Sequence, residues 1–194
     1  MVQGVLGYKG PKKEAPPRNG FVDGVVGAFA SAFFLGYTPV IPGTAGAALG
    51  VFLYWSVLYK LQLNPLILFF VYMGIFIFGG FMCTLAMQAF TEADYNLIVM
   101  DKALGAAIAV SALSPEEWKI GARVFIIFLI FRIIETTKLF PLNQLTKIPK
   151  GWGMMADDVA GGIMTMLIVK FMIPEGVWQF FTLGLPAVKK AAGG

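Results

Sequence analysis

Two adjacent carboxylates, Asp157 and Asp158, are the strongest chemical signal in the sequence. They follow the segment Gly151–Ala156, and a helix is expected to begin at the pair. Adjacent carboxylates repel each other, which costs stability unless a cation or hydrogen bonds compensate. Hard oxygen ligands suit a divalent cation. The simpler interpretation is helix capping, with Asp157 as the cap and Asp158 favoured by the helix dipole. A metal site and a helix cap both remain open for this pair.

A second group of charges, Arg132, Glu135 and Lys138, repeats at intervals of three residues. This spacing places all three side chains on one face of a helix. One interpretation is an ion-paired stripe where the helix leaves a membrane, with Lys138 extending to the surface. The other is a phosphate site, in which Arg132 and Lys138 bind phosphate oxygens and Glu135 binds a metal or orients a group.

Two further segments add a carboxylate, a cation and a break between helices. Asp101-Lys102 is either a self-compensated pair near the membrane surface or a metal ligand beside a phosphate contact. The segment 38–46 contains Pro39, Pro42, Gly43 and Gly46, which interrupt a helix. It is either an ordinary re-entrant connector or a helix start whose backbone N–H groups bind an anion.

Taken together, these segments favour phosphoryl chemistry at a membrane. A metal held by carboxylates, with Arg and Lys binding the phosphate oxygens, is a common arrangement for such reactions. All four segments border apolar stretches of the chain. The sequence therefore predicts a site that suits the head group of a phospholipid.

The elements that must position these side chains are membrane helices. Of 194 residues, 58% are hydrophobic and only 13% are charged, with 15 basic and 11 acidic residues. A soluble domain is about a quarter charged, so the composition excludes a soluble globule and a disordered chain. The net charge of +4 is spread thinly, which argues against a nucleic-acid partner. Histidine is absent, and the single cysteine, Cys83, is expected to be a buried hydrophobic residue.

The predicted architecture is all-α, a polytopic integral membrane bundle of about four to six helices, some of them short or re-entrant. Residues 1–22 form a basic, proline-rich N-terminal tail, residues 23–185 a single helical membrane domain, and residues 186–194 a short polar C-terminal tail. Uncharged stretches on either side of Lys60 are long enough to span a bilayer. The expected helices run over about 23–37, 44–60, 65–89 and a small-residue segment around 103–109. A further helix is expected from Pro115, with Ser114 as its N-cap, to about Glu135 or Thr137, and the last from Asp157 to about Met172.

Four blocks of the sequence resemble the phosphatidylglycerophosphatase A family. They are Gly36–Gly46, Val99–Lys102, the segment from Phe131 to Pro141 and the segment from Gly153 to Gly162. Each block is short, but all four occur in the family's order and at similar spacing. The resemblance implies a small helical membrane enzyme that uses Mg²⁺ to hydrolyse phosphatidylglycerol phosphate to phosphatidylglycerol and phosphate, a step of phospholipid biosynthesis.

The resemblance also implies roles for individual residues. The expected metal ligands are Asp101, Glu135, Asp157 and Asp158, which with Arg132 and Lys138 make up the catalytic set. The expected substrate-binding residues are Gly43, Thr44, Arg132 and Lys138, together with Lys102, whose phosphate contact is expected from its place beside Asp101 and not from the resemblance. The chain departs from the family pattern at two of these positions. Glu135 replaces an aspartate, and Lys102 replaces an acidic residue, which reverses a charge.

Lys102 keeps an alternative function open: a non-catalytic family member, or one of altered specificity, that binds an anionic lipid or a partner. A transporter or channel is disfavoured because no internal repeat is visible. The expected location is the bacterial inner membrane, crossed several times, with the N-terminus and the active site facing the cytoplasm. The glycine-rich and alanine-rich faces around Gly105 and Gly162 are compatible with a homo-oligomer.

Overall fold

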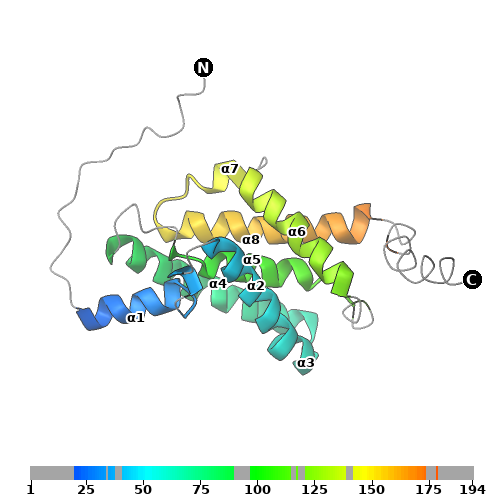
Figure 1. Ribbon diagram of the computed structural model, residues 1–194, viewed down its shortest axis with the longest axis horizontal. Helices are drawn as coiled ribbons and strands as arrows, with labels where there is room; N and C mark the ends of the chain where they lie inside the picture. Colours follow the sequence, from blue (N-terminus) through cyan, green and yellow to red (C-terminus); the bar gives the residue numbers. More distant parts are fainter. Residues whose placement is uncertain are drawn as a thin grey trace, which may run out of the picture.

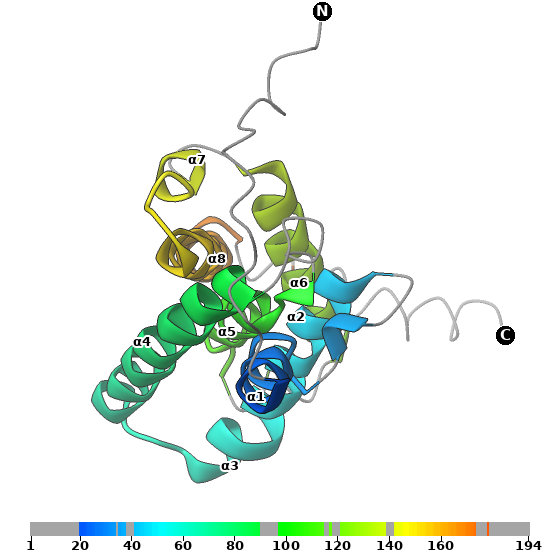
Figure 2. The ribbon, with the colours of Figure 1, turned by 90° about the vertical axis from the view of Figure 1, so that its left-hand side faces the viewer.

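The short helix α5 (Met100–Val110) lies at the centre of the protein and is its most thoroughly buried helix. The computed structural model describes residues 20–33, 35–37, 41–89, 97–114, 117, 121–138, 142–173 and 178. Helices α2 (Pro42–Leu53), α4 (Pro65–Ala89), α6 (Gly121–Thr137) and α8 (Gly151–Leu167) pack around α5 (Figures 1 and 2). Small residues such as Gly105, Ala106 and Ala109 allow this close approach.

The remaining elements are short or lie at the edges of the bundle. They are α1 (Gly20–Ala30), a 3₁₀ turn (Leu35–Tyr37), α3 (Tyr59–Leu61), α7 (Leu142–Leu145) and two π-helical turns (Tyr54–Leu58 and Ile168–Met172). Every regular element in the described residues is a helix, as the all-α prediction requires. The predicted tails and the segment around Pro174 lie largely outside those residues.

The predicted helix bounds are right for the long apolar segments and wrong at α1. The helix expected over 44–60 is continuous from Pro42 to Leu61, and the helix from Pro65 to Ala89 is confirmed. The helix expected over 23–37 stops at Ala30. Ala32 and Phe33 have positive φ angles of 49° and 57°, a left-handed conformation that ends a helix.

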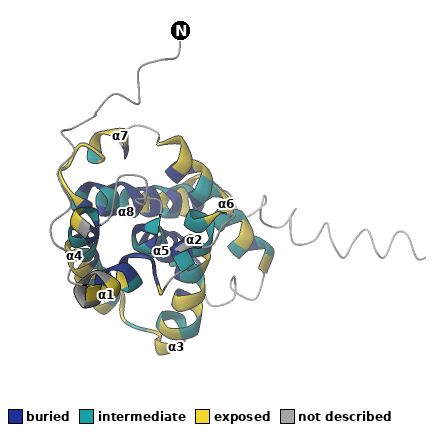
Figure 3. Ribbon diagram, turned by 60° about the vertical axis from the view of Figure 1, so that its left-hand side comes forward, coloured by how far each residue is buried: buried dark blue, intermediate teal, exposed yellow. Residues whose placement is uncertain are grey.

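Two helices are long and apolar enough to cross a membrane, by length and composition. They are Pro42–Leu61, of 20 residues, and Pro65–Gln88, of 24 residues. Large apolar side chains of α4, such as those of Leu66, Phe70 and Phe81, are exposed. The ribbon of α5, by contrast, is coloured mainly as buried (Figure 3). Water disfavours exposed apolar side chains and lipid does not, so these two helices indicate association with a membrane.

Glycines set the distance between the central helix and its neighbours. A side chain at Gly50 of α2 would collide with the carbonyl oxygen of Ala103 in α5. A side chain at Gly162 of α8 would collide with the carbonyl oxygen of Gly105, also in α5. The small-residue faces around Gly105 and Gly162 are therefore used in contacts within one chain.

The pair Gly161 and Gly162 provides a test of this packing. We expect Gly162→Ala to lower the free energy of unfolding by about 1–3 kcal/mol, because the new methyl group must displace the backbone of α5. Gly161→Ala is the matched control, since its methyl group would lie 3.8 Å or more from its neighbours. It should leave stability unchanged or raise it, because alanine favours a helix. Thermal unfolding in detergent measures both, and equal midpoints would contradict the prediction.

Candidate active site

The predicted site residues come from four helices that meet beside the N-terminal end of α5. Helix α2 supplies Gly43 and Thr44 from its first turn. Helix α5 supplies Asp101 and Lys102, also from its first turn. The other residues are Arg132 and Glu135 in the last turns of α6, Lys138 just after it, and Asp157 and Asp158 in α8.

The helix-cap interpretation of Asp157 and Asp158 is wrong, because α8 begins at Gly151 rather than at the pair. The backbone N–H of Gly151 donates to the Thr84 hydroxyl of α4 at 3.2 Å. A side chain at Gly151 would collide with the backbone of Cys83 and Thr84. Contact with α4 therefore fixes where α8 starts. Because α8 starts at Gly151, Asp157 and Asp158 lie within the body of the helix, where both carboxylates are buried.

Lys102 is surrounded by carboxylates. Its Nζ lies 3.1 Å from Asp101 Oδ2, 3.3 Å from Asp158 Oδ2 and 3.8 Å from Glu135 Oε1. Its backbone N–H also donates to Asp101 Oδ1 at 2.8 Å. Burial by itself would lower the pKa of Lys102, but the three carboxylates outweigh it, so the pKa is raised and the side chain stays charged.

Arg132, Glu135 and Lys138 continue the cluster toward the surface. Arg132 Nη1 donates to Glu135 Oε2 at 2.6 Å, the three-residue pair that the sequence predicted. Lys138 follows the last residue of α6 with a positive φ of 45°. Its Nζ donates to Asp157 Oδ2 at 2.7 Å. The side chain of Lys138 is 49% exposed, whereas that of Asp157 is 6% exposed, so the site opens beside Lys138.

Burial raises the pKa of both adjacent aspartates. For Asp158, burial is the main cause, and the negative charge of Asp101 adds to it against the effect of Lys102. For Asp157, burial outweighs the hydrogen bond and the charge of Lys138. A carboxylate whose pKa is raised is a better proton acceptor near neutral pH than an exposed one.

The first turn of α2 lies directly against the side chains of Lys102 and Arg132. A side chain at Gly43 would come within 3.0 Å of Lys102 Cδ and 3.3 Å of Arg132 Nη2. The N-terminal end of a helix attracts anions, and here it meets two positive side chains. The backbone N–H of Thr44 already donates to Ile41 O at 3.1 Å, so a substrate contact by Thr44 stays a prediction. Residues 38–40 and Pro141 lie outside the described residues.

The four expected metal ligands have no common centre in the structure. Asp101, Glu135 and Asp158 face Lys102, whereas Asp157 faces Lys138. Within the part of the chain that the structure describes, no group of three or more His, Cys, Asp or Glu residues is arranged to hold a metal ion. Carboxylate oxygens suit Mg²⁺ chemically, but the Lys102 ammonium occupies the space between the three carboxylates that face it. The arrangement does not fit the ion, and the Mg²⁺ site stays a prediction.

A separate charged pair, Arg123 and Glu117, lies at the other end of α6 and is structural. Arg123 is buried, donates to Glu117 Oε1 at 2.5 Å and lies over the ring of Trp178 at 5.1 Å. Glu117 also accepts from the backbone N–H of Ser114 at 2.7 Å, which is half of a capping box. The helix start expected at Pro115 lies outside the described residues. These contacts explain a charge in an apolar helix without a role in chemistry.

Thr84 connects two of the helices around the site. Its hydroxyl accepts from Gly151 and also donates to Gly80 O at 2.7 Å, which ties the start of α8 to α4. Nothing in the sequence marks this threonine, because Gly151 lies 67 residues away and only the fold brings them together. Thr84 supports the site by holding the helix that carries Asp157 and Asp158.

A family model for phosphatidylglycerophosphatase A matches residues 28–173, well over half of the chain. The chain belongs to the phosphatidylglycerophosphatase A family. The matched segment contains all of the charged site residues, from Asp101 to Asp158. The resemblance seen in the four sequence blocks is therefore confirmed, as is the prediction of a phosphoric monoester hydrolase.

Three known proteins are moderately similar to this chain. The chain is 30% identical to phosphatidylglycerophosphatase A of Escherichia coli strain K12 over 145 residues, covering 74% of this chain and 80% of the relative. It is 28% identical to the Haemophilus influenzae enzyme of the same name over 146 residues, covering 72% and 83%. It is also 25% identical to a candidate phosphatidylinositol-3-phosphatase of Bacteroides thetaiotaomicron over 140 residues, covering 72% and 87%. No solved structure matches the chain.

Proposed function

We propose that this protein hydrolyses the phosphomonoester of phosphatidylglycerol phosphate at a membrane surface and releases phosphatidylglycerol and phosphate. One observation carries the proposal: Lys102 and Arg132 converge on the start of α2 beside the buried aspartates, in a site that opens at Lys138. Family membership supports phosphatase chemistry in general. The specific lipid is the proposal.

The cations bind and neutralise the phosphate. Arg132 offers a planar set of donors that suits two phosphate oxygens at once, and Lys102 lies on the same side of Gly43. Lys138, at the open side, meets the phosphate as it enters. Positive groups fixed in this way stabilise the charge that develops on the phosphate oxygens during hydrolysis.

Asp158 is placed to accept a proton from water. Its Oδ2 lies 3.3 Å from Lys102 Nζ, so a phosphate bound to Lys102 lies close to this carboxylate. A water oxygen attacks phosphorus while Asp158 takes its proton, and the bond between phosphorus and the glycerol oxygen breaks. The released oxygen takes up a proton from solvent at the open side. The Mg²⁺ requirement that the resemblance implies is not part of this proposal, because the arranged residues do not fit the ion.

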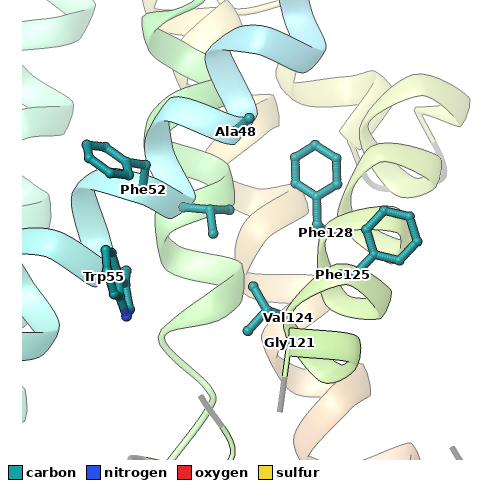
Figure 4. Close-up of a pocket in the computed structure, with 8 residues that line it drawn as sticks. Ala48, Phe52, Trp55, Gly121, Val124, Phe125 and Phe128 are labelled. Atoms are coloured by element: carbon teal, nitrogen blue, oxygen red, sulfur yellow. The ribbon is translucent and has the colours of Figure 1, made fainter. Parts of the chain in front are cut away.

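An apolar groove beside the site supports a lipid substrate. Helix α2 runs away from the site and α6 runs toward it, and a groove of about 520 Å³ lies between them (Figure 4). Ala48 lies one helical turn from Thr44, and Phe128 lies one turn from Arg132. The volume is in the range of small-molecule pockets. We propose that an acyl chain of the same lipid lies in this groove.

The proposed location is the cytoplasmic face of a bacterial plasma membrane. The two candidate spans support association with a membrane. The side that the site faces, and further crossings beyond these two helices, are proposals. Labelling of single cysteines introduced at Lys138 and at Leu61, in intact cells and in opened membranes, tests the topology. A Lys138 position labelled in intact cells would contradict the cytoplasmic site.

Phosphate release from defined lipids tests the proposed function. The purified protein is assayed in mixed micelles with phosphatidylglycerol phosphate, phosphatidylinositol 3-phosphate, phosphatidic acid and the chain-free glycerol 3-phosphate. We expect the highest kcat/KM for phosphatidylglycerol phosphate, and a loss of at least tenfold for the chain-free compound, which cannot use the groove. Preference for phosphatidylinositol 3-phosphate would assign another lipid to the same site.

The alternative function remains a non-catalytic lipid-binding protein, and Lys102 is the observation that favours it. A lysine within a cluster of acids neutralises carboxylates that would otherwise be available. A wild-type protein that binds anionic vesicles but releases no phosphate from any lipid in the panel would support this alternative. Gain of turnover in Lys102→Glu would then identify the charge reversal as its cause.

A further inference from the structure

The Lys102 ammonium lies where a cation shared by three carboxylates would lie. Its distances to Asp101, Asp158 and Glu135 are 3.1, 3.3 and 3.8 Å, and these carboxylates come from three different helices. The side chains of Asp101 and Asp158 are 1% and 4% exposed. Buried carboxylates that face one another are stable only with a cation between them or with bound protons. Lys102 supplies that cation from within the chain.

The surroundings of Lys102 make room for its side chain. Gly43 has no side chain, and an added one would meet Lys102 Cδ at 3.0 Å and Cε at 3.2 Å. The backbone N–H of Lys102 is fixed by Asp101 Oδ1 at 2.8 Å. The other oxygen of Glu135 pairs with Arg132 Nη1 at 2.6 Å. The carboxylates that surround the ammonium are therefore compensated by side chains of this chain.

We propose that Lys102 takes the place of a divalent metal ion in this carboxylate cluster, so that the folded site is held together without metal at this position. Mg²⁺ needs oxygen ligands at about 2.1 Å around a single point. The three carboxylates instead lie 3.1, 3.3 and 3.8 Å from the Lys102 ammonium, distances that suit a lysine and not the ion. The proposal concerns the same site as the proposed function. It rests on that function only for what the site does. Its test measures metal binding and stability, which do not require turnover.

Mn²⁺ binding to the purified full-length protein in detergent tests the substitution. Mn²⁺ replaces Mg²⁺ at carboxylate sites and can be followed directly by electron paramagnetic resonance. We expect wild type to bind no Mn²⁺ at this cluster and to show the same thermal midpoint in Mg²⁺ as in EDTA. We expect Lys102→Ala to bind Mn²⁺ with a Kd at least tenfold below the highest Mn²⁺ concentration at which wild type shows no binding. Its thermal midpoint should be lowered in EDTA and raised by several degrees with Mg²⁺.

Three further variants show whether the change in Mn²⁺ binding arises at the carboxylates around Lys102. Lys147→Ala removes an exposed lysine from the segment between α7 and α8 and should behave as wild type. Lys102→Arg keeps a cation and should remain independent of metal. Asp158→Asn combined with Lys102→Ala should lose the Mn²⁺ binding that Lys102→Ala gains. Where Lys102→Ala does not fold without metal, Lys102→Gln, which keeps polar contacts, takes its place.

Two results would overturn the proposal. One is Mn²⁺ binding by wild type that is lost in Asp158→Asn, because metal and lysine would then share the cluster. The other is no Mn²⁺ binding by Lys102→Ala and Lys102→Gln, because the lysine would then not be occupying a metal position. The Mn²⁺ and stability measurements do not depend on the lipid assay. An error in the proposed substrate can therefore be distinguished from an error in the proposed role of Lys102.

Discussion

Asp158→Asn is expected to lower kcat for phosphate release by roughly 10²–10⁴-fold, the usual contribution of a positioned proton acceptor. Asparagine keeps the size of the side chain but cannot accept the proton of the attacking water. Two carboxylates, Asp101 and Glu135, remain around Lys102, so the site should keep its shape. KM should change much less than kcat, because the cations that bind phosphate are retained.

Glu117→Gln is the matched control for Asp158→Asn. It makes the same carboxylate-to-amide change in the structural pair with Arg123, at the other end of α6. It should lower the thermal midpoint without changing kcat. Undiminished turnover in Asp158→Asn would remove this residue from the chemistry, and an equal loss in both variants would attribute the effect to folding.

Arg132→Gln is expected to raise KM for the lipid phosphate by roughly 10–100-fold. A hydrogen bond to a charged group contributes about 1.5–3 kcal/mol, which corresponds to this range. The substitution also leaves Glu135 without its 2.6 Å partner, although Lys102 Nζ still lies 3.8 Å from the other Glu135 oxygen. Initial rates at varied surface concentrations of lipid in mixed micelles separate KM from kcat.

Two variants show whether the effect at Arg132 concerns phosphate. Arg132→Lys keeps the charge but loses the planar donor set, so its KM should fall between those of wild type and Arg132→Gln. Lys147→Gln removes a cation from an exposed loop and should leave KM unchanged. A normal KM in Arg132→Gln would restrict this arginine to pairing with Glu135.

The helix pattern was largely predictable because it depends on local chemistry. Pro65 begins a helix where the sequence indicates, and Pro42 begins one two residues before the expected start at about Thr44, since proline is tolerated in a first turn and breaks what precedes it. The Arg132–Glu135 pair follows directly from a spacing of three residues. The start of α8 was not predictable, because it depends on Gly151 fitting against Thr84 of another helix.

The sequence by itself determined which residues are candidates for the chemistry: a small number of charges, concentrated between Asp101 and Asp158, in an otherwise apolar chain. It also marked Lys102 as the departure from the family pattern that reverses a charge. Only the tertiary structure decided what that lysine contacts. Its ammonium reaches Asp158, 56 residues away, because Gly105 and Gly162 let α5 and α8 approach closely. Contacts between helices depend on how closely the helices approach each other. The spacing of residues along the chain does not give that distance.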